Sequence, residues 1–354
     1  MTLAELIHSI PLFEGLDAGE LEPILGISQH ATFFPGARIV RQGQAADSAF
    51  ILETGTVEVV TTLPGGGELA VAEFGPGSIL GEMALLENAV RSATMIARTA
   101  SSGYFVERDT FRMLLAQRND TAFDIQHRIT RTLCQRLRDL NARIVEVMGR
   151  ETQGHAVPVG SEEAGKVQRL APGFDWRAFV PLLPPFRRFR ADELDELAGA
   201  VNAFALERGA PIFAEGSPAD SGFIVVRGAL EILRAERGRL RRIGVLGPGR
   251  LCGLLALIEG EPHSMTARAR EQTVVMEIGR ELFARLYRGH DRLAAKFQDA
   301  VNQELLQALA RTNNQLTRLI SQARIRAHRG KRADVKALEA ALTAQDCTSG
   351  SEET

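Results

Sequence analysis

The chain has 354 residues, a length that favours two domains with short additional segments. Its 42 basic and 44 acidic side chains nearly cancel, which disfavours nucleic-acid binding by the chain as a whole. The three cysteines, Cys134, Cys252 and Cys347, lie far apart in the sequence, which argues against structural disulfides and a zinc site and fits a reducing cytosol.

Targeting segments are not evident in the sequence. Residues 1–11 lack the basic and long apolar stretches of a signal peptide. The most apolar window, residues 251–258, is too short to cross a bilayer. We therefore expect a cytoplasmic protein with no membrane attachment.

The first predicted elements are a short helix over residues 16–27 and a series of short strands. Apolar runs at 49–53, 57–60 and 69–72 are separated by glycine-containing turns such as PGGG at 64–67. Alternation of apolar and polar residues with regularly spaced turns predicts an antiparallel β-sandwich or β-roll.

A long helix is predicted to follow these strands. Its apolar residues are spaced by three and four positions, at Ile129, Leu133, Leu137, Leu140, Ile144 and Val147. This spacing is typical of a helix that pairs with another helix, although packing on its own sandwich would give a shorter version of the same pattern.

The remaining elements repeat the first set. Residues 75–85 (GPGSILGEMAL) recur as 247–257 (GPGRLCGLLAL), an offset of 172, and the helical spacing recurs at Val301, Leu305, Leu309, Thr312, Leu316 and Leu319. Upstream, Gly43, Asp47, Phe50 and Gly55 match Gly216, Asp220, Phe223 and Gly228 at an offset of 173. The chain is therefore a duplication of a unit of about 150 residues.

The repeat sets the expected domain boundaries. We expect a first domain over 1–148, a flexible linker over 149–175, and a second domain over 176–322 that starts with a helix at 191–203. The remainder, 323–354, begins basic and ends acidic, and its end is expected to be disordered.

The residues that carry ligand chemistry cluster in the first unit. Gly81, Glu82, Met83 and Ala84 are followed by Arg91, Ser92 and Ala93. A phosphate needs a cation with planar donors, which arginine supplies, and main-chain N–H groups that glycine allows to approach closely. A sugar hydroxyl needs an acceptor, and Glu82 supplies a carboxylate. Taken singly, each residue would be an ordinary surface or turn residue.

In this order, the segment resembles the phosphate-binding cassette of the cyclic nucleotide-binding domain, the module of catabolite activator protein and protein kinase A regulatory subunits. The glycine pattern around Gly36, Gly43 and Gly55 is also similar to that family, and the resemblance covers most of the chain. It implies two β-roll (jelly-roll) domains, mainly β with α, each closed by a long helix. Val90 stands where the family often has proline.

The resemblance also implies roles for individual residues. Glu82 would bind the ribose hydroxyl, and Arg91 with Ser92 would bind the phosphate. Gly81, Met83, Ala84 and Ala93 would form the main chain of the cassette. The family reads the base from the closing helix, which points to Asn141 as an adenine contact.

The second unit lacks the charged pair of the first. Leu254 and His263 stand at the positions of Glu82 and Arg91. Leucine accepts no hydrogen bond, and histidine is mostly neutral at physiological pH and lacks the fork of arginine. We expect a degenerate domain kept as a scaffold; binding of a different ligand through His263 and Ser264 is the alternative.

These observations predict a non-enzymatic sensor that needs no cofactor. No Walker loop, zinc-protease, nucleophile-elbow or paired-carboxylate signature is present. The expected ligand is cAMP, with cGMP or a cyclic dinucleotide still open, and the expected effector is a protein. The long helices would pair within one chain or between two copies. A ligand-independent scaffold is a rival, as is a transcription regulator acting through the basic run at 324–332 or a DNA-binding partner; direct DNA binding is disfavoured.

Overall fold

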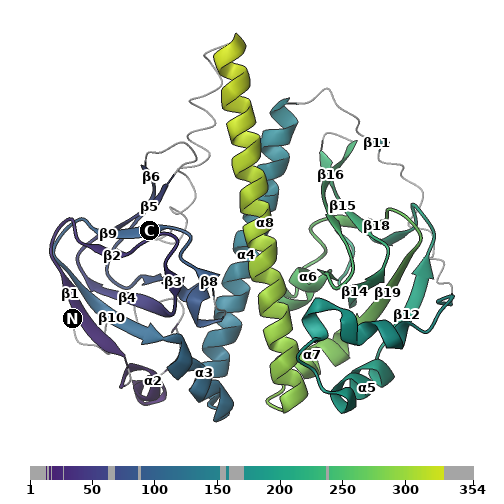
Figure 1. The fold of residues 1–354 in the computed structure, drawn as a ribbon, viewed down its shortest axis with the longest axis horizontal. Coiled ribbons are helices and arrows are strands. Elements are labelled where there is room, and N and C mark those ends of the chain that lie inside the picture. Colours follow the sequence, from purple (N-terminus) through teal and green to yellow (C-terminus); the bar gives the residue numbers. More distant parts are fainter. Residues whose placement is uncertain are drawn as a thin grey trace. The chain divides into compact units, whose positions relative to one another are not determined.

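The computed structural model describes residues 13, 16, 18–26, 28–62, 68–86, 89–151, 157–158, 171–236 and 239–330. The chain divides into two compact units, one formed by residues 1–130 with 324–354 and the other by residues 131–323. The division falls inside helix α4 (Asp120–Glu151), so one continuous helix starts in the first unit and continues in the second (Figure 1).

The first unit is a β-roll made of short antiparallel strands. Its elements are α2 (Ala18–Leu25), β1 (Gln29–Phe33), β2 (Arg38–Val40), β3 (Ala45–Ala46), β4 (Ser48–Thr54), β5 (Val57–Thr62), β6 (Glu68–Phe74), β7 (Ile79–Leu80), the 3-10 helix η2 (Glu82–Leu85), β8 (Ala89–Val90), β9 (Thr94–Ala97), β10 (Ser101–Glu107) and α3 (Arg108–Ala116). The strands form two sheets of order β1-β10-β4-β7 and β2-β9-β5-β6, with β3 and β8 as a separate pair.

The second unit repeats this topology. Its elements are β11 (Val157–Pro158), η3 (Trp176–Leu182), η4 (Pro184–Phe186), α5 (Ala191–Ala200), β12 (Asn202–Leu206), β13 (Pro211–Phe213), β14 (Ser221–Arg227), β15 (Leu230–Glu236), β16 (Arg239–Leu246), β17 (Leu251–Cys252), α6 (Leu254–Glu259), β18 (Thr266–Ala269), β19 (Thr273–Gly279), α7 (Arg280–Arg288) and α8 (Arg292–Gly330). The sheets have the orders β12-β19-β14-β17 and β11-β16-β15-β18-β13. The two four-stranded orders of the first unit recur here, with β11 added at one edge and the β3–β8 pair not repeated among the described strands. The predicted tandem β-roll fold is confirmed.

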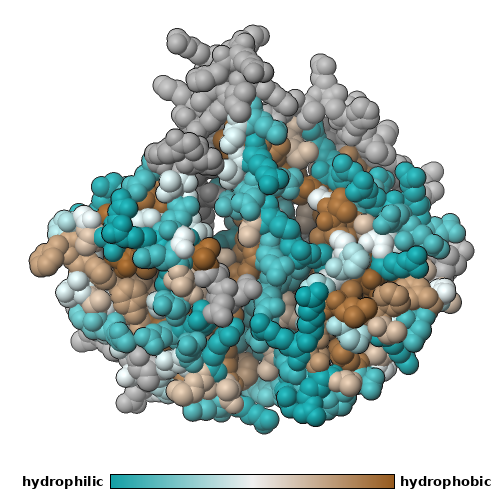
Figure 2. Space-filling view, in the orientation of Figure 1, coloured by the Kyte–Doolittle hydropathy of each residue, from teal (hydrophilic) through white to brown (hydrophobic). Residues whose placement is uncertain are grey.

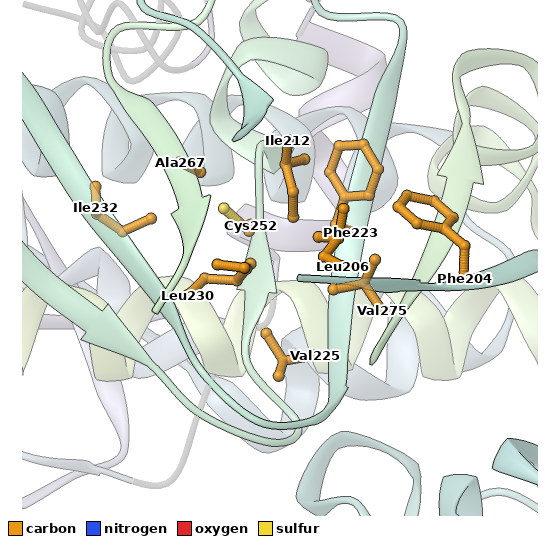
Figure 3. Packing of buried hydrophobic residues seen from close by; sticks show 11 residues of the cluster. Phe204, Leu206, Ile212, Phe223, Val225, Leu230, Ile232, Cys252, Ala267 and Val275 are labelled. Atoms are coloured by element: carbon orange, nitrogen blue, oxygen red, sulfur yellow. The ribbon is translucent and has the colours of Figure 1, made fainter. Parts of the chain in front are cut away.

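The cores lie between the two sheets of each unit. Strands β4 and β14 carry uninterrupted apolar runs and are buried along most of their length, as expected for strands covered on both faces. In the first unit the core cluster contains Val40, Phe50, Leu52, Val57, Leu80 and Met95. Figure 3 shows its counterpart in the second unit, where Phe204 and Phe223 pack with aliphatic side chains and Cys252.

Equivalent main-chain hydrogen bonds connect a glycine turn to the residue at position 91 or 263 in the two units. The amide of Gly43 donates to the carbonyl of Arg91 over 2.9 Å, and that of Gly216 donates to the carbonyl of His263 over 2.7 Å. Gly43 and Gly216 both have positive φ, at 83° and 82°, which glycine adopts without strain. The duplicated glycines therefore mark duplicated turns.

The predicted apolar spacing of the two long helices corresponds to their buried faces. On α4 all six predicted residues are buried; on α8, Val301, Leu305, Leu309 and Leu316 are buried, while Thr312 and Leu319 are half-buried. The opposite face of α8 exposes polar residues such as Gln307, Arg311 and Asn314, and Figure 2 shows hydrophilic side chains along it. Most of the predicted linker and the acidic end of the chain lie outside the described residues.

Candidate functional site

A sharp turn after strand β7 creates the centre of the candidate site. Strand β7 pairs with β4, which places Leu80 opposite Phe50. The next residue, Gly81, has φ of 72° and caps the 3-10 helix η2. A left-handed conformation of this kind is costly for any residue with a Cβ, so glycine allows the chain to leave the sheet and enter η2 at once.

Arg91 is held beneath this turn by its main chain. It follows β8, which pairs with β3, and its amide donates to the carbonyl of Gln44 over 2.8 Å. Its side chain is 6% exposed. The main chain therefore directs a guanidinium group into the protein rather than toward solvent.

The guanidinium has polar partners from the start of β4. Nη2 of Arg91 donates to Oγ of Ser48 over 3.1 Å and lies 3.6 Å from the carboxylate of Asp47. The Asp47 side chain is 71% exposed, so water weakens its attraction for the guanidinium. Burial lowers the pKa of Arg91, and Asp47 opposes that change only in part. Arg91 is thus a buried cation that forms its ion pair with an exposed carboxylate.

Gly81 and Arg91 approach closely. A Cβ atom added to Gly81 would lie 2.5 Å from Nη1 of Arg91 and 3.3 Å from the methyl group of Met95. The absence of a side chain at position 81 therefore allows the guanidinium to pack directly against the main chain of the turn. An anion at this place would meet both the cation and the main chain of the turn.

The other predicted residues are distributed around this centre. Glu82 is 4% exposed and Ala84 is buried, whereas Met83 and Ala93 are half-buried and Ser92 is exposed. The structure thus brings Gly81, Glu82 and Arg91 into one unit around the start of η2. Asn141 is also buried, but it lies in the part of α4 that belongs to the second unit, and its role stays a prediction.

Two residues of the site were not identified as functional from the sequence. Asp47 was noted only as part of the repeated pattern and Ser48 was given no role, yet both are polar partners of Arg91. A usable signal existed, because both positions recur as Asp220 and Ser221 in the second unit. Helix α3 also contacts the site, since Arg112 donates to the carbonyl of Leu86 at the end of η2 over 3.1 Å.

The equivalent place in the second unit is filled by apolar and aromatic groups. His263 is 5% exposed and stacks on Phe213, with ring centroids 3.8 Å apart and an interplanar angle of 9°. A Cβ on Gly253 would lie 3.1 Å from the His263 ring, and one on Gly222 would lie 2.6 Å from Leu254. These side chains occupy the space next to the turn and supply no permanent cation.

The buried histidine predicts a pH dependence of stability. Burial lowers the pKa of His263 from 6.5 to about 4, and Asp220 only partly opposes the shift. Between these values the unfolded chain binds a proton that the folded chain does not bind. The free energy of unfolding should therefore fall as the pH drops through this window, by up to about 3 kcal/mol.

Urea unfolding at about pH 7 and about pH 4.5 measures this effect, with His263→Gln as the comparison. Other acidic and basic groups titrate in both proteins, so the difference between them isolates His263. We expect a smaller loss of stability on acidification in His263→Gln than in the wild type. Equal losses in both proteins would show that the ring is not held in its neutral form.

The described residues form neither a metal-ligand cluster nor a membrane-spanning helix. Within the described ranges, no three or more His, Cys, Asp or Glu side chains come together as potential metal ligands. Nor does any helix among those residues have the length and apolar character needed to span a bilayer.

Comparison with known proteins gave matches over most of the chain. The family model described as "Cyclic nucleotide-binding domain" matches residues 31–118 and 204–290. The chain is 22% identical over 276 residues to a cAMP-dependent protein kinase regulatory subunit of Blastocladiella emersonii, covering 78% of this chain and 56% of the relative. It is 25% identical over 275 residues to the corresponding protein of Yarrowia lipolytica, covering 78% and 58%. The chain thus spans little more than half the length of these curated relatives.

Similar solved structures include the regulatory domain of Toxoplasma gondii PKA with cAMP, at 21% identity and a TM-score of 0.32, covering 86% of this chain and 95% of that one. The catabolite activator protein of Thermus thermophilus matches at 23% identity and a TM-score of 0.32, covering 40% of this chain and 72% of that one.

Proposed function

Because the chain carries two domains of the cyclic nucleotide-binding family, we propose that it is a cAMP sensor that binds one nucleotide, in the first domain. The observation that carries this proposal is the buried guanidinium of Arg91, which packs against the main chain of the turn at Gly81. The ion pair of this buried cation with Asp47 is weakened by water because the Asp47 carboxylate is largely exposed, and the phosphate of a cyclic nucleotide would give the guanidinium a stronger anionic partner.

The remaining contacts follow from the chemistry of the ligand. The cyclic phosphate would take the place next to Arg91 that Asp47 approaches from the solvent side. Glu82 would accept a hydrogen bond from the ribose 2′-hydroxyl, and Ser92 and the main chain of Ala93 would donate to the phosphate. Each charge-assisted bond of this kind contributes about 1.5–3 kcal/mol.

The ligand is proposed to be cAMP, with Asn141 as the contact to adenine. The curated relatives are named as cAMP-dependent protein kinase regulatory subunits, which supports this choice. Those names also support a protein as the effector. We propose that α4 transmits the state of the first domain to this effector, because the helix continues from the first unit into the second.

Calorimetric titration of the full chain tests the proposal. We expect cAMP to bind with one equivalent per chain, more tightly than cGMP, and linear 5′-AMP to bind far more weakly because its phosphate carries an additional charge and lacks the ring. Two equivalents of cAMP would contradict the filled second site. No binding of any cyclic nucleotide would contradict the sensor function and leave a scaffold that acts without ligand.

A further inference from the structure

An ion pair joins the long helix of the first domain to the second domain. Arg138, on α4, donates through Nε to Oε2 of Glu259 over 3.1 Å and through Nη2 to the same oxygen. The Glu259 side chain is 9% exposed and that of Arg138 is 30% exposed. Both residues belong to the same compact unit. Such a forked contact between largely buried groups fixes the helix more tightly than a solvated surface pair.

Glu259 occupies a position where a carboxylate needs a partner. It is the last residue of α6, and Gly260 ends the helix with φ of 76°. The C-terminal end of a helix carries partial negative charge, so a carboxylate there is unfavourable unless a cation compensates it. Arg138 supplies that cation. Removing it would leave a negative charge nearly buried at the negative end of a helix dipole.

The Arg138–Glu259 ion pair involves the element of the second domain that corresponds to the candidate ligand site of the first. By the sequence repeat, α6 corresponds to η2, the short helix of the ligand site in the first domain. In the second domain this cassette has Leu254 and His263 in place of the charged residues. The part of the fold that is proposed to bind phosphate in the first domain thus contacts a long helix in the second.

A second attachment lies further along the same helix. Arg241, on β16, donates through Nη1 to the main-chain carbonyl of Met148 over 2.8 Å. Asn141, the proposed adenine contact, lies on α4 between Arg138 and Met148. The second domain therefore holds the helix on both sides of that residue.

The other end of α4 is connected to the ligand site. Asn119 caps the helix, accepting a hydrogen bond from the amide of Ala122 over 2.9 Å. The preceding helix, α3, carries Arg112, which donates to the carbonyl of Leu86 at the end of η2. A shift of η2 on ligand binding would therefore be passed to α3 and to the start of α4.

We infer that the remnant cassette of the second domain binds the long helix of the first, and that the Arg138–Glu259 pair is a positioning contact that raises the affinity of the first domain for its nucleotide. The nucleotide part of this inference rests on the proposed function. The physical reason is pre-organisation: a helix already held in place loses less conformational freedom when the ligand binds.

Titration of charge variants with cAMP tests the effect on affinity. We expect Arg138→Ala and Glu259→Gln each to raise the Kd for cAMP about tenfold, which corresponds to a typical coupling energy. The exchanged pair Arg138→Glu with Glu259→Arg should return the Kd to within about threefold of the wild type, because the contact is restored with its charges reversed. The matched control, Arg131→Ala, removes an exposed arginine two turns earlier on the same helix and should leave the Kd unchanged.

Hydrogen exchange of the ligand-free chain tests the anchoring without any nucleotide. Arg138→Ala should speed exchange of amides in 138–148 and 254–259 relative to the wild type and to Arg131→Ala. Unchanged exchange would overturn the anchoring. Unchanged or tighter cAMP binding with faster exchange would overturn the link to affinity. If the wild-type chain bound no cyclic nucleotide, the proposed function and the effect on affinity would fall together, while the exchange result would still decide the anchoring.

Discussion

Replacing Arg91 with methionine is expected to weaken cAMP binding about a thousandfold without lowering the stability of the ligand-free protein. The expected loss follows from two charge-assisted hydrogen bonds to the phosphate, together worth about 4 kcal/mol. Methionine fills a similar volume with apolar atoms, so the packing around Ser48 and Met95 is largely kept.

The stability of the ligand-free protein is expected to be kept because the buried charge of Arg91 is itself unfavourable. Burial disfavours the charged guanidinium, as the lowered pKa of Arg91 indicates, and the exposed Asp47 offsets little of that penalty. Replacing a buried charge with an apolar side chain of similar volume is often neutral or stabilising, by about 1–4 kcal/mol. Ser48 keeps a partner after the change, because its hydroxyl donates to Asp47 over 3.0 Å.

Calorimetry with cAMP and urea unfolding without ligand measure the two effects on the same preparation. His263→Met is the matched control, because it changes the equivalent position of the second domain and should leave the cAMP affinity intact. A loss of more than about 2 kcal/mol of stability in Arg91→Met would instead make Arg91 a structural residue, since that exceeds most neutral core exchanges.

Substituting alanine for Gly81 is expected to weaken cAMP binding about a hundredfold. The new Cβ would lie 2.5 Å from Nη1 of Arg91, which is shorter than a van der Waals contact allows. The guanidinium must therefore move away from the position in which it would bind the phosphate. Alanine at a φ of 72° also adds about 1–2 kcal/mol of backbone strain. A displacement of about 1 Å at a charge-assisted contact is enough to remove most of its energy.

Gly36→Ala separates the two contributions. Gly36 has a similar φ of 85°, but a Cβ there would meet nothing within 4 Å. We expect both variants to lose comparable stability from strain, and only Gly81→Ala to lose affinity for cAMP. Equal affinities in the two variants would mean that the phosphate does not bind where the Arg91 guanidinium meets the turn at Gly81.

The fold was predictable from the sequence because several of its turns require glycine, which few other residues can replace at positive φ. Gly43 and Gly55 recur as Gly216 and Gly228, and all four adopt positive φ in the structure. Only glycine tolerates such backbone conformations readily, so its repeated spacing indicates repeated turns. The apolar runs between these turns then had to be strands, and the topology followed from the resemblance to the family.

The contacts of the site were less predictable, because they join residues far apart in the sequence. Arg91 meets Ser48 across 43 positions, and Arg138 meets Glu259 across 121 positions. Such pairs depend on how strands twist and how a helix rotates about its axis, which the spacing of apolar residues specifies only coarsely. Leu254 and His263 showed that the second domain lacks the charged pair of the first, but nothing in the sequence pointed to Phe213 as the ring that stacks on His263.

The ring stack of Phe213 and His263 also bears on the evolutionary history open to the second domain. Arginine at position 263 alone would place a charge against the Phe213 ring, and glutamate at position 254 alone would bury a carboxylate at a site that is 3% exposed. Each single substitution passes through a less stable protein, because unpaired buried charges are strongly unfavourable. Building a charged ligand site at this place would therefore require several residues to change together.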